Sequence, residues 1–116
     1  MVYIREALYI QIVRFKLDSA NAQELADAVQ VHLSDWISKC PGFVSANLHV
    51  SDDGQHMINY AQWRDKDSFE SFVKSADQEA LTKTIDKFKP DNVESNHFEL
   101  VAQQSIEDEF WSKPRF

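Results

Sequence analysis

The feature that most constrains the fold of this chain is a pair of segments with alternating apolar and polar residues. They are FVSANLHVS and QHMINYAQW, on either side of Asp52-Asp53-Gly54. Such alternation is typical of strands that bury one face, and Asp-Gly suits the two positive-φ positions of a type I′ turn. With Asp53 and Gly54 as the turn residues, Leu48 lies opposite Asn59. The sequence therefore predicts two antiparallel strands joined by a tight turn.

This register divides the side chains of the hairpin between two faces. One face is apolar apart from a single amide, Asn59, and we expect it to lie under helices. Its members are Val44, Ala46, Leu48, Val50, Met57, Asn59, Ala61 and Trp63. The opposite face mixes Phe43, Ile58 and Tyr60 with polar side chains. Such a face is too apolar for solvent alone, so a sheet from a second protomer is its natural cover.

A strand and a helix are predicted before the hairpin. Residues 7–17 are mostly apolar and β-branched, but polar residues interrupt them too often for a core helix, so we expect a strand. Asn21 and Glu24 have the spacing of a capping box at the start of a helix whose apolar residues recur every three or four positions. Cys40-Pro41-Gly42 ends that helix.

A second helical region and a final strand are predicted after the hairpin. Asp67 and Glu70 form another expected capping box, the helical pattern loosens around residues 75–77, and Pro90 ends it. Residues 97–103 alternate again and predict a fourth strand. The order βαββαβ is that of a ferredoxin-like α+β fold, with one antiparallel sheet and two helices on one face.

The 116 residues are expected to form one domain. Its core covers about residues 7–103, and a C-terminal tail covers residues 104–116. Phe110, Trp111 and Phe116 give this tail exposed aromatic side chains. We expect these rings to contact another surface.

Composition limits the partners and the compartment. Twelve Lys and Arg against nineteen Asp and Glu give a net charge of −7, so nucleic acids and anionic membranes are poor partners. Arg5 and Glu6 interrupt the N-terminal apolar stretch, so neither a signal peptide nor a transmembrane segment is predicted. The expected location is the cytoplasm. The single cysteine, Cys40, follows a helix C-terminus and is therefore expected to be a poor nucleophile.

Asn59 and Trp63 are the candidate site residues, two pleats apart on the apolar face. A buried amide that is left unpaired costs roughly 1–3 kcal/mol, and a buried indole N–H also needs a partner. Each residue alone is readily explained as part of the core, with the amide bonded to a neighbouring backbone group. Together they are typical of a small-molecule cavity, which is mostly apolar with a few donors that orient the ligand.

The chain resembles the antibiotic biosynthesis monooxygenase family, and within it the actinorhodin-type anthrone oxygenases. The specific motifs are Pro41-Gly42-Phe43, the Asp53-Gly54 turn and Asn59-Tyr60-Ala61-Gln62-Trp63, and the resemblance covers roughly residues 7–103. It implies a dimeric α+β barrel, a homodimer whose protomers face sheet to sheet and keep a cavity between sheet and helices. It also implies a reaction of molecular oxygen with a phenolic, anthrone-type substrate that uses no metal, flavin or haem.

The resemblance also assigns roles to single residues. Asn59 and Trp63 match the catalytic Asn and Trp of the family, which bind the substrate's oxygen functions and help to form and discharge a substrate carbanion and a peroxide. Phe69 stands where the family has a cavity Tyr, and Lys83 stands at or beside its helical Arg. The expected substrate-binding residues are Phe69, Lys83, Leu48 and Met57.

Other functions remain open on the same fold. One is a non-catalytic dimer that binds a small ligand or serves in stress or signalling, and another is a cofactor-free isomerase that turns over without oxygen. Haem degradation is disfavoured, because Thr82 stands near the haem-ligating His of that branch and residues 7–17 contain no Asn. A zinc site is disfavoured too, because only His49 and His56 are expected to be neighbours.

Overall fold

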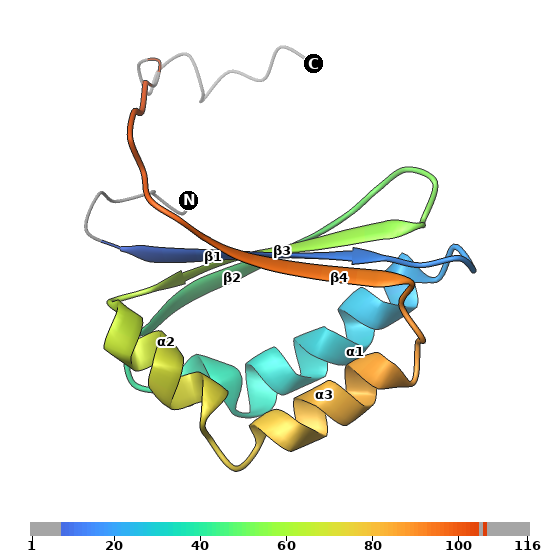
Figure 1. The fold of residues 1–116 in the computed structure, drawn as a ribbon, viewed down its shortest axis with the longest axis horizontal. Coiled ribbons are helices and arrows are strands. Elements are labelled where there is room, and N and C mark those ends of the chain that lie inside the picture. Colours follow the sequence, from blue (N-terminus) through green and yellow to red (C-terminus); the bar gives the residue numbers. More distant parts are fainter. Residues whose placement is uncertain (1–7, 105, 107–116) are drawn as a thin grey trace.

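An antiparallel sheet of four strands, covered on one face by helices, is the frame of the structure (Figure 1). The computed structural model describes residues 8–104 and 106. Its elements are β1 (Tyr9–Lys16), α1 (Ala22–Asp35), the short 3₁₀ helix η1 (Ile37–Lys39), β2 (Phe43–Val50), β3 (His56–Trp63), α2 (Lys66–Val73), α3 (Gln78–Asp86) and β4 (Asn92–Phe98). With strand order β2-β3-β1-β4, the predicted ferredoxin-like α+β fold is confirmed. No helix in this described part is long and apolar enough to cross a membrane.

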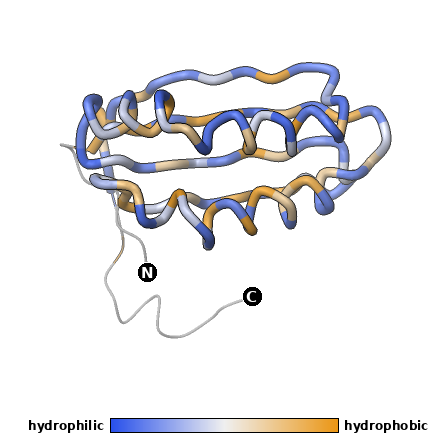
Figure 2. Tube along the Cα trace, turned by 90° about the horizontal axis from the view of Figure 1, so that it is seen from below, coloured by the Kyte–Doolittle hydropathy of each residue, from blue (hydrophilic) through white to orange (hydrophobic). Residues whose placement is uncertain are grey.

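Each helix turns its apolar side toward the sheet. Along α1, Leu25, Val29 and Leu33 recur every fourth residue and are buried. Seen from below in Figure 2, apolar and polar stretches alternate along the helices, as this one-sided burial requires. Phe15 of β1 and Met57 of β3 are buried in the same core, so the apolar stripe of α1 packs on the centre of the sheet.

The second helical region consists of two helices. The break between them falls at residues 74–77, where the helical pattern of the sequence weakens. Helix α2 ends at Val73, and the N–H of Lys74 caps it by donating to the carbonyl of Glu70. Helix α3 begins at Gln78. Ser and Asp at the break favour turns over helix interiors. The break lets α3 run beside α1, while α2 remains at the end of β3 (Figure 1).

The capping box predicted at the start of α1 is wrong. Asn21 is the N-cap residue, but its side chain makes no capping hydrogen bond. The carbonyl of Gly54, in the hairpin turn, accepts instead from the N–H of Ala22 at 2.9 Å. A contact between segments far apart in the chain thus satisfies one of the N–H groups that the first turn of a helix leaves without an intrahelical partner.

The capping box predicted at Asp67 is also wrong, because α2 begins earlier. The N-cap is Asp65, whose extended backbone aims its carboxylate at the first turn. Its Oδ1 accepts from the backbone N–H of Ser68 at 2.8 Å. Asp67 lies inside the first turn, where a carboxylate still interacts favourably with the helix dipole.

The register of the hairpin is the predicted one, but its turn is not. Leu48 is paired with Asn59, as expected. Of the two predicted turn residues, Gly54 has a positive φ of +73° and Asp53 does not, whereas a type I′ turn requires both. The N–H of Gly54 donates to the carbonyl of Ser51 at 3.0 Å, and the Ser51 hydroxyl donates to the Asp53 carboxylate at 2.7 Å.

A β-bulge at the start of β2 changes the faces predicted for its first residues. Phe43 is paired with Trp63 and Ser45 with Gln62, so Val44 is the extra residue. The rings of Phe43 and Trp63 meet edge to face with centroids 5.4 Å apart, and Val44 is 45% exposed. The prediction that placed Val44 under the helices and Phe43 on the opposite face is therefore wrong.

The last strand lies earlier in the chain than predicted. It is β4, over Asn92–Phe98, and not residues 97–103. The N–H of Asp91 donates to the carbonyl of Lys16 at 2.8 Å, which starts the pairing with β1 directly after the turn that follows α3. An edge strand tolerates polar residues. Because β4 is mostly polar, its sequence lacks the apolar alternation by which the hairpin strands were predicted. The aromatic residues predicted to make contacts in the tail, Phe110, Trp111 and Phe116, lie outside the described residues.

Replacing the α2 cap by Asp65→Ala is expected to lower the melting temperature. The backbone N–H and then the hydroxyl of Ser68 hold the pKa of the Asp65 carboxyl below its ordinary value. A lowered pKa means that the cap stabilises the fold above the unfolded value of about 3.9 and that this contribution is lost as pH falls through the folded pKa. Melting curves from pH 7 to pH 2 should show the two proteins converging at low pH. Asp67→Ala is the control, and an equal or larger effect there would contradict the assignment.

A second prediction concerns Gly42, which precedes β2 with a φ of +83°. Its carbonyl accepts from the N–H of Arg64 at 2.7 Å, and a Cβ at this position would overlap the side chain of Ser68. We expect Gly42→Ala to destabilise the fold by roughly 1–3 kcal/mol in urea unfolding. Adding Ser68→Gly should restore part of the loss, because it relieves the overlap and leaves the strained φ. An unchanged unfolding midpoint in Gly42→Ala would contradict this packing.

Candidate active site

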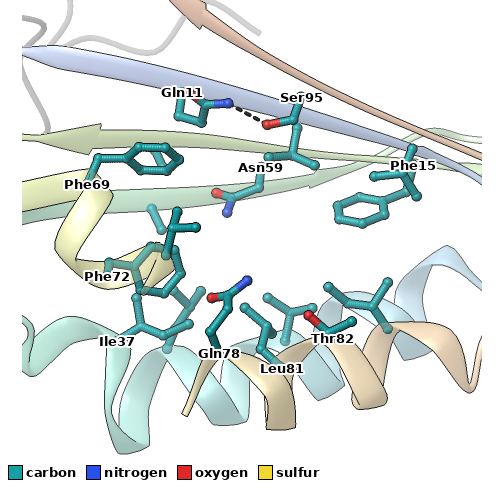
Figure 3. Close-up of a pocket in the computed structure, with 18 of the residues that line it drawn as sticks. Gln11, Phe15, Ile37, Asn59, Phe69, Phe72, Gln78, Leu81, Thr82 and Ser95 are labelled. Atoms are coloured by element: carbon teal, nitrogen blue, oxygen red, sulfur yellow. Dashed lines mark hydrogen bonds between the residues drawn. The ribbon is translucent and has the colours of Figure 1, made fainter. Parts of the chain in front are cut away.

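A cavity of about 360 Å³ lies between the sheet and the helices (Figure 3). All four strands and the three α-helices contribute to its lining, which is mostly apolar and aromatic. Small-molecule sites typically have volumes of roughly 300–1,000 Å³ and a few polar groups that orient the ligand. The polar residues of this lining are Gln11, Asn59, Gln78, Thr82, Asp86 and Ser95.

Aromatic rings form one end of the cavity around Trp63, which is only 2% exposed. Phe72 of α2 stacks on Trp63 with centroids 5.0 Å apart, and Phe69 meets it edge-on at 6.1 Å. Tyr9 continues the cluster, with its ring 5.3 Å from that of Phe69 and 3.8 Å from that of His97. Aromatic faces of this kind suit the flat surface of an aromatic ligand.

Asn59 supplies a polar group on the sheet side of the cavity. It lies in the middle of β3, paired with Val13 on β1 and with Leu48 on β2. Its Oδ1 is buried and accepts no hydrogen bond from the protein. A buried amide oxygen without a partner lowers the stability of the fold by roughly 1–3 kcal/mol. A ligand in the cavity that donates a hydrogen bond to this oxygen would remove that cost.

Gln78 supplies a second amide, from the helix side, that the sequence analysis missed. It is the first residue of α3, and its amide points into the space below Asn59 (Figure 3). Its Oε1 is likewise buried without a partner. The sequence carried no signal for it, because a glutamine at the start of a helix is ordinarily solvated and nothing in its spacing connects it with β3.

Gln11 and Ser95 are the other missed polar pair. Gln11 on β1 is 7% exposed, and its Nε2 donates to the Ser95 hydroxyl on β4. The bond joins the neighbouring strands β1 and β4 close to Asn59 and is drawn in Figure 3. Ser95 went unnoticed because the sequence analysis did not place β4 at this position.

The predicted site residues are only partly brought together. Asn59, Trp63, Phe69 and Met57 all line the cavity. Leu48 does not line it and packs, half-buried, against the core.

Lys83 also lies outside the cavity lining. It projects from the exposed side of α3, where its Nζ is 3.4 Å from the Glu79 carboxylate. Exposed pairs of this kind contribute little to stability. The Lys83 ammonium group thus contacts solvent and Glu79, and it does not reach the cavity lining in which a substrate would bind.

A hydrogen-bonded chain ties together the two helices beneath the cavity. The indole N–H of Trp36 donates to Nδ1 of His32 at 3.0 Å. Because an indole N–H can only donate, Nδ1 is an acceptor and Nε2 of the neutral ring carries the proton. Nε2 then donates to the Thr84 hydroxyl at 2.8 Å, and Thr84 donates to the Ala80 carbonyl at 3.1 Å. These hydrogen bonds link α1 to α3 and so support the helical side of the cavity.

Among residues 8–104 and 106, no group of three or more His, Cys, Asp or Glu side chains is placed to hold a metal ion. Cys40 is half-buried, and its thiol donates to the Trp36 carbonyl with the sulfur 3.6 Å from the oxygen. Burial, and then the nearby charge of Asp77, raise the pKa of the Cys40 thiol. A raised pKa lowers the thiolate fraction and with it the nucleophilicity expected at this position.

The family model of the antibiotic biosynthesis monooxygenases matches residues 8–84. The chain belongs to this family. A sequence relative is the tetracenomycin-F1 monooxygenase of Streptomyces glaucescens, 39% identical over 62 residues. That alignment covers 53% of this chain and 55% of the relative, so the chain spans about half the length of the curated relative that it matches.

Solved structures share the fold. A monooxygenase from the ActVA-Orf6 gene of Streptomyces coelicolor, in complex with nanaomycin D, has a TM-score of 0.79 at 22% identity, over 88% of this chain and 95% of that one. SnoaB, a cofactor-independent oxygenase from Streptomyces nogalater, has a TM-score of 0.66 at 18% identity, over 88% of this chain and 99% of that one.

Proposed function

We propose that this chain is a cofactor-independent monooxygenase, which uses molecular oxygen to oxidise a phenolic or quinol-like aromatic substrate of the anthrone type. The observation that carries the proposal is the amide oxygen of Asn59, which is buried without a protein partner in a cavity walled by aromatic rings. The tetracenomycin-F1 monooxygenase relative and the fold shared with SnoaB support this chemistry.

The proposed reaction converts a CH₂ group between two aromatic rings into a carbonyl, with water as the second product. The CH₂ loses a proton, and the resulting carbanion reduces dioxygen and forms a C–O bond. The peroxide anion then takes up a proton and becomes a hydroperoxide. Loss of the second C–H proton forms the carbonyl and breaks the O–O bond, and the departing hydroxide is protonated to water. The substrate supplies all four electrons that reduce dioxygen, so no further reductant is needed.

In this mechanism Asn59 acts on the charge that develops on the substrate's oxygen. Its amide N–H donates to the phenolate or enolate that forms when the CH₂ is deprotonated. Such a donor is worth most in a site from which water is excluded. Trp63 and Phe72 hold the aromatic plane, and Phe69 contributes a ring but no hydroxyl, so it moves no proton.

We expect Asn59→Ala to lower oxygen-dependent turnover of 1,8-dihydroxyanthrone by about 100-fold or more, because it removes the donor to the developing negative charge. Trp63→Phe keeps a ring, removes the indole N–H and should lower turnover less. The measurement is oxygen uptake by chelator-treated protein, corrected for the autoxidation of the substrate.

Asn92→Ala is the matched control for Asn59→Ala. Asn92 is an exposed amide at the start of β4 that bonds to Glu94, so turnover should be unchanged. Circular dichroism of each variant checks the fold. Oxygen uptake no faster than autoxidation by folded wild-type protein would contradict the oxygenase and favour a ligand-binding protein. Substrate conversion without oxygen would favour an isomerase.

We also propose that the chain works as a homodimer through the sheet face turned away from the helices. Ile12 and Tyr60 are cross-strand neighbours on that face, and Ile58 lies beside them. All three are half-buried, and a second sheet would cover their remaining apolar surface. The cytoplasmic location expected from the sequence stays a prediction.

Light scattering coupled to size-exclusion chromatography should therefore give twice the chain mass for the wild-type protein. Ile58→Asp should give the monomer, because it places a charge in the proposed interface. Val31→Asp is the control, since Val31 is 58% exposed on α1 and the dimer should persist. A monomeric wild-type protein would overturn the proposal.

A further inference from the structure

We propose that Gln78 is a second substrate-positioning residue, which binds the edge of an aromatic ligand opposite to the edge held by Asn59. The inference rests on the proposed function only in taking the ligand to be a hydroxylated aromatic. It assigns the cavity a preference for ligands with a hydrogen-bonding group at each of two opposite edges.

The position of Gln78 on α3 is the first observation. Gln78, Leu81, Thr82 and Ile85 all line the cavity, and their spacing of three, four and seven residues puts them on one face of the helix. Leu81 on this face is buried in the core. An apolar residue at position 78 would complete the stripe at no hydrogen-bonding cost, yet the chain has an amide there.

The lack of an internal partner is the second observation. The Oε1 of Gln78 is buried and accepts no hydrogen bond from the protein. Two helix-surface glutamines of α1 behave differently, because Gln23 donates to Asp27 at 2.9 Å and Gln30 donates to Ser34 at 3.3 Å. A buried amide oxygen without a partner costs roughly 1–3 kcal/mol, and a ligand in the cavity would remove this cost.

The arrangement of the two amides is the third observation. Figure 3 shows Asn59 reaching down from the sheet and Gln78 reaching up from α3, so the two face each other across the cavity. The amide nitrogen of Gln11 already donates to Ser95, which leaves Asn59 and Gln78 as the lining amides with unpartnered buried oxygens. A phenolic hydroxyl at each edge of a ligand between them would donate to both oxygens.

The test measures binding without turnover, by calorimetry under argon with three probes: 2,6-dihydroxynaphthalene, 2-naphthol and naphthalene. Wild-type protein should bind the diol more tightly than 2-naphthol by about three- to tenfold, the worth of one added hydrogen bond. Gln78→Leu should abolish this preference and keep or improve the affinity for naphthalene. Gln23→Leu, the same substitution in the first turn of α1, should leave all three affinities unchanged.

Thermal unfolding without ligand separates positioning from a structural role. Gln78→Leu should raise the melting temperature, because it removes a buried amide oxygen that has no protein partner and puts an apolar side chain in its place. A lower melting temperature would mean that Gln78 holds the fold together, and it would overturn the assignment. So would a diol preference that survives in Gln78→Leu, or wild-type protein with no such preference. Since no step uses oxygen, these results stand whether or not the anthrone assay shows turnover.

Discussion

The pairing of β3 with a strand on each side is the constraint on which the site depends. Asn59 is held between Val13 and Leu48 by two antiparallel ladders. Because successive side chains point to opposite faces, a slip of one residue would turn Asn59 and Trp63 away from the helices. Such a slip would break hydrogen bonds in both ladders and expose the buried face of β3. The centre of the sheet therefore holds the amide and the indole toward the cavity.

The opposite wall depends on the interruption between α2 and α3. A single uninterrupted helix would present one continuous apolar stripe in one direction. Two shorter helices instead place Phe69 and Phe72 around Trp63 and bring α3 beside α1. The hydrogen bonds from Trp36 to His32 and from His32 to Thr84 then join α1 to α3. A cavity remains because the two helices cover different parts of the sheet.

Polar groups in this cavity work against stability. Asn59 and Gln78 each bury an amide oxygen without a protein partner, a cost that an apolar side chain would not carry. Functional sites are where proteins keep such costly groups. The two amides therefore connect the proposed oxygenase, which uses one to stabilise developing charge, with the proposed ligand preference, which needs both.

The sequence alone determined the register of the hairpin from Ser45 to Gln62 and the inward direction of Asn59. Local alternation carries that information, because the period of a strand is two. It also determined the order of strands and helices, through their hydrophobic periods. The tertiary structure decided the bulge that turns Phe43 inward, the use of the Gly54 carbonyl to cap α1, and the placement of Gln78 across the cavity from Asn59. Each of these joins or shifts segments that meet only when the chain has folded, so no local pattern could encode them.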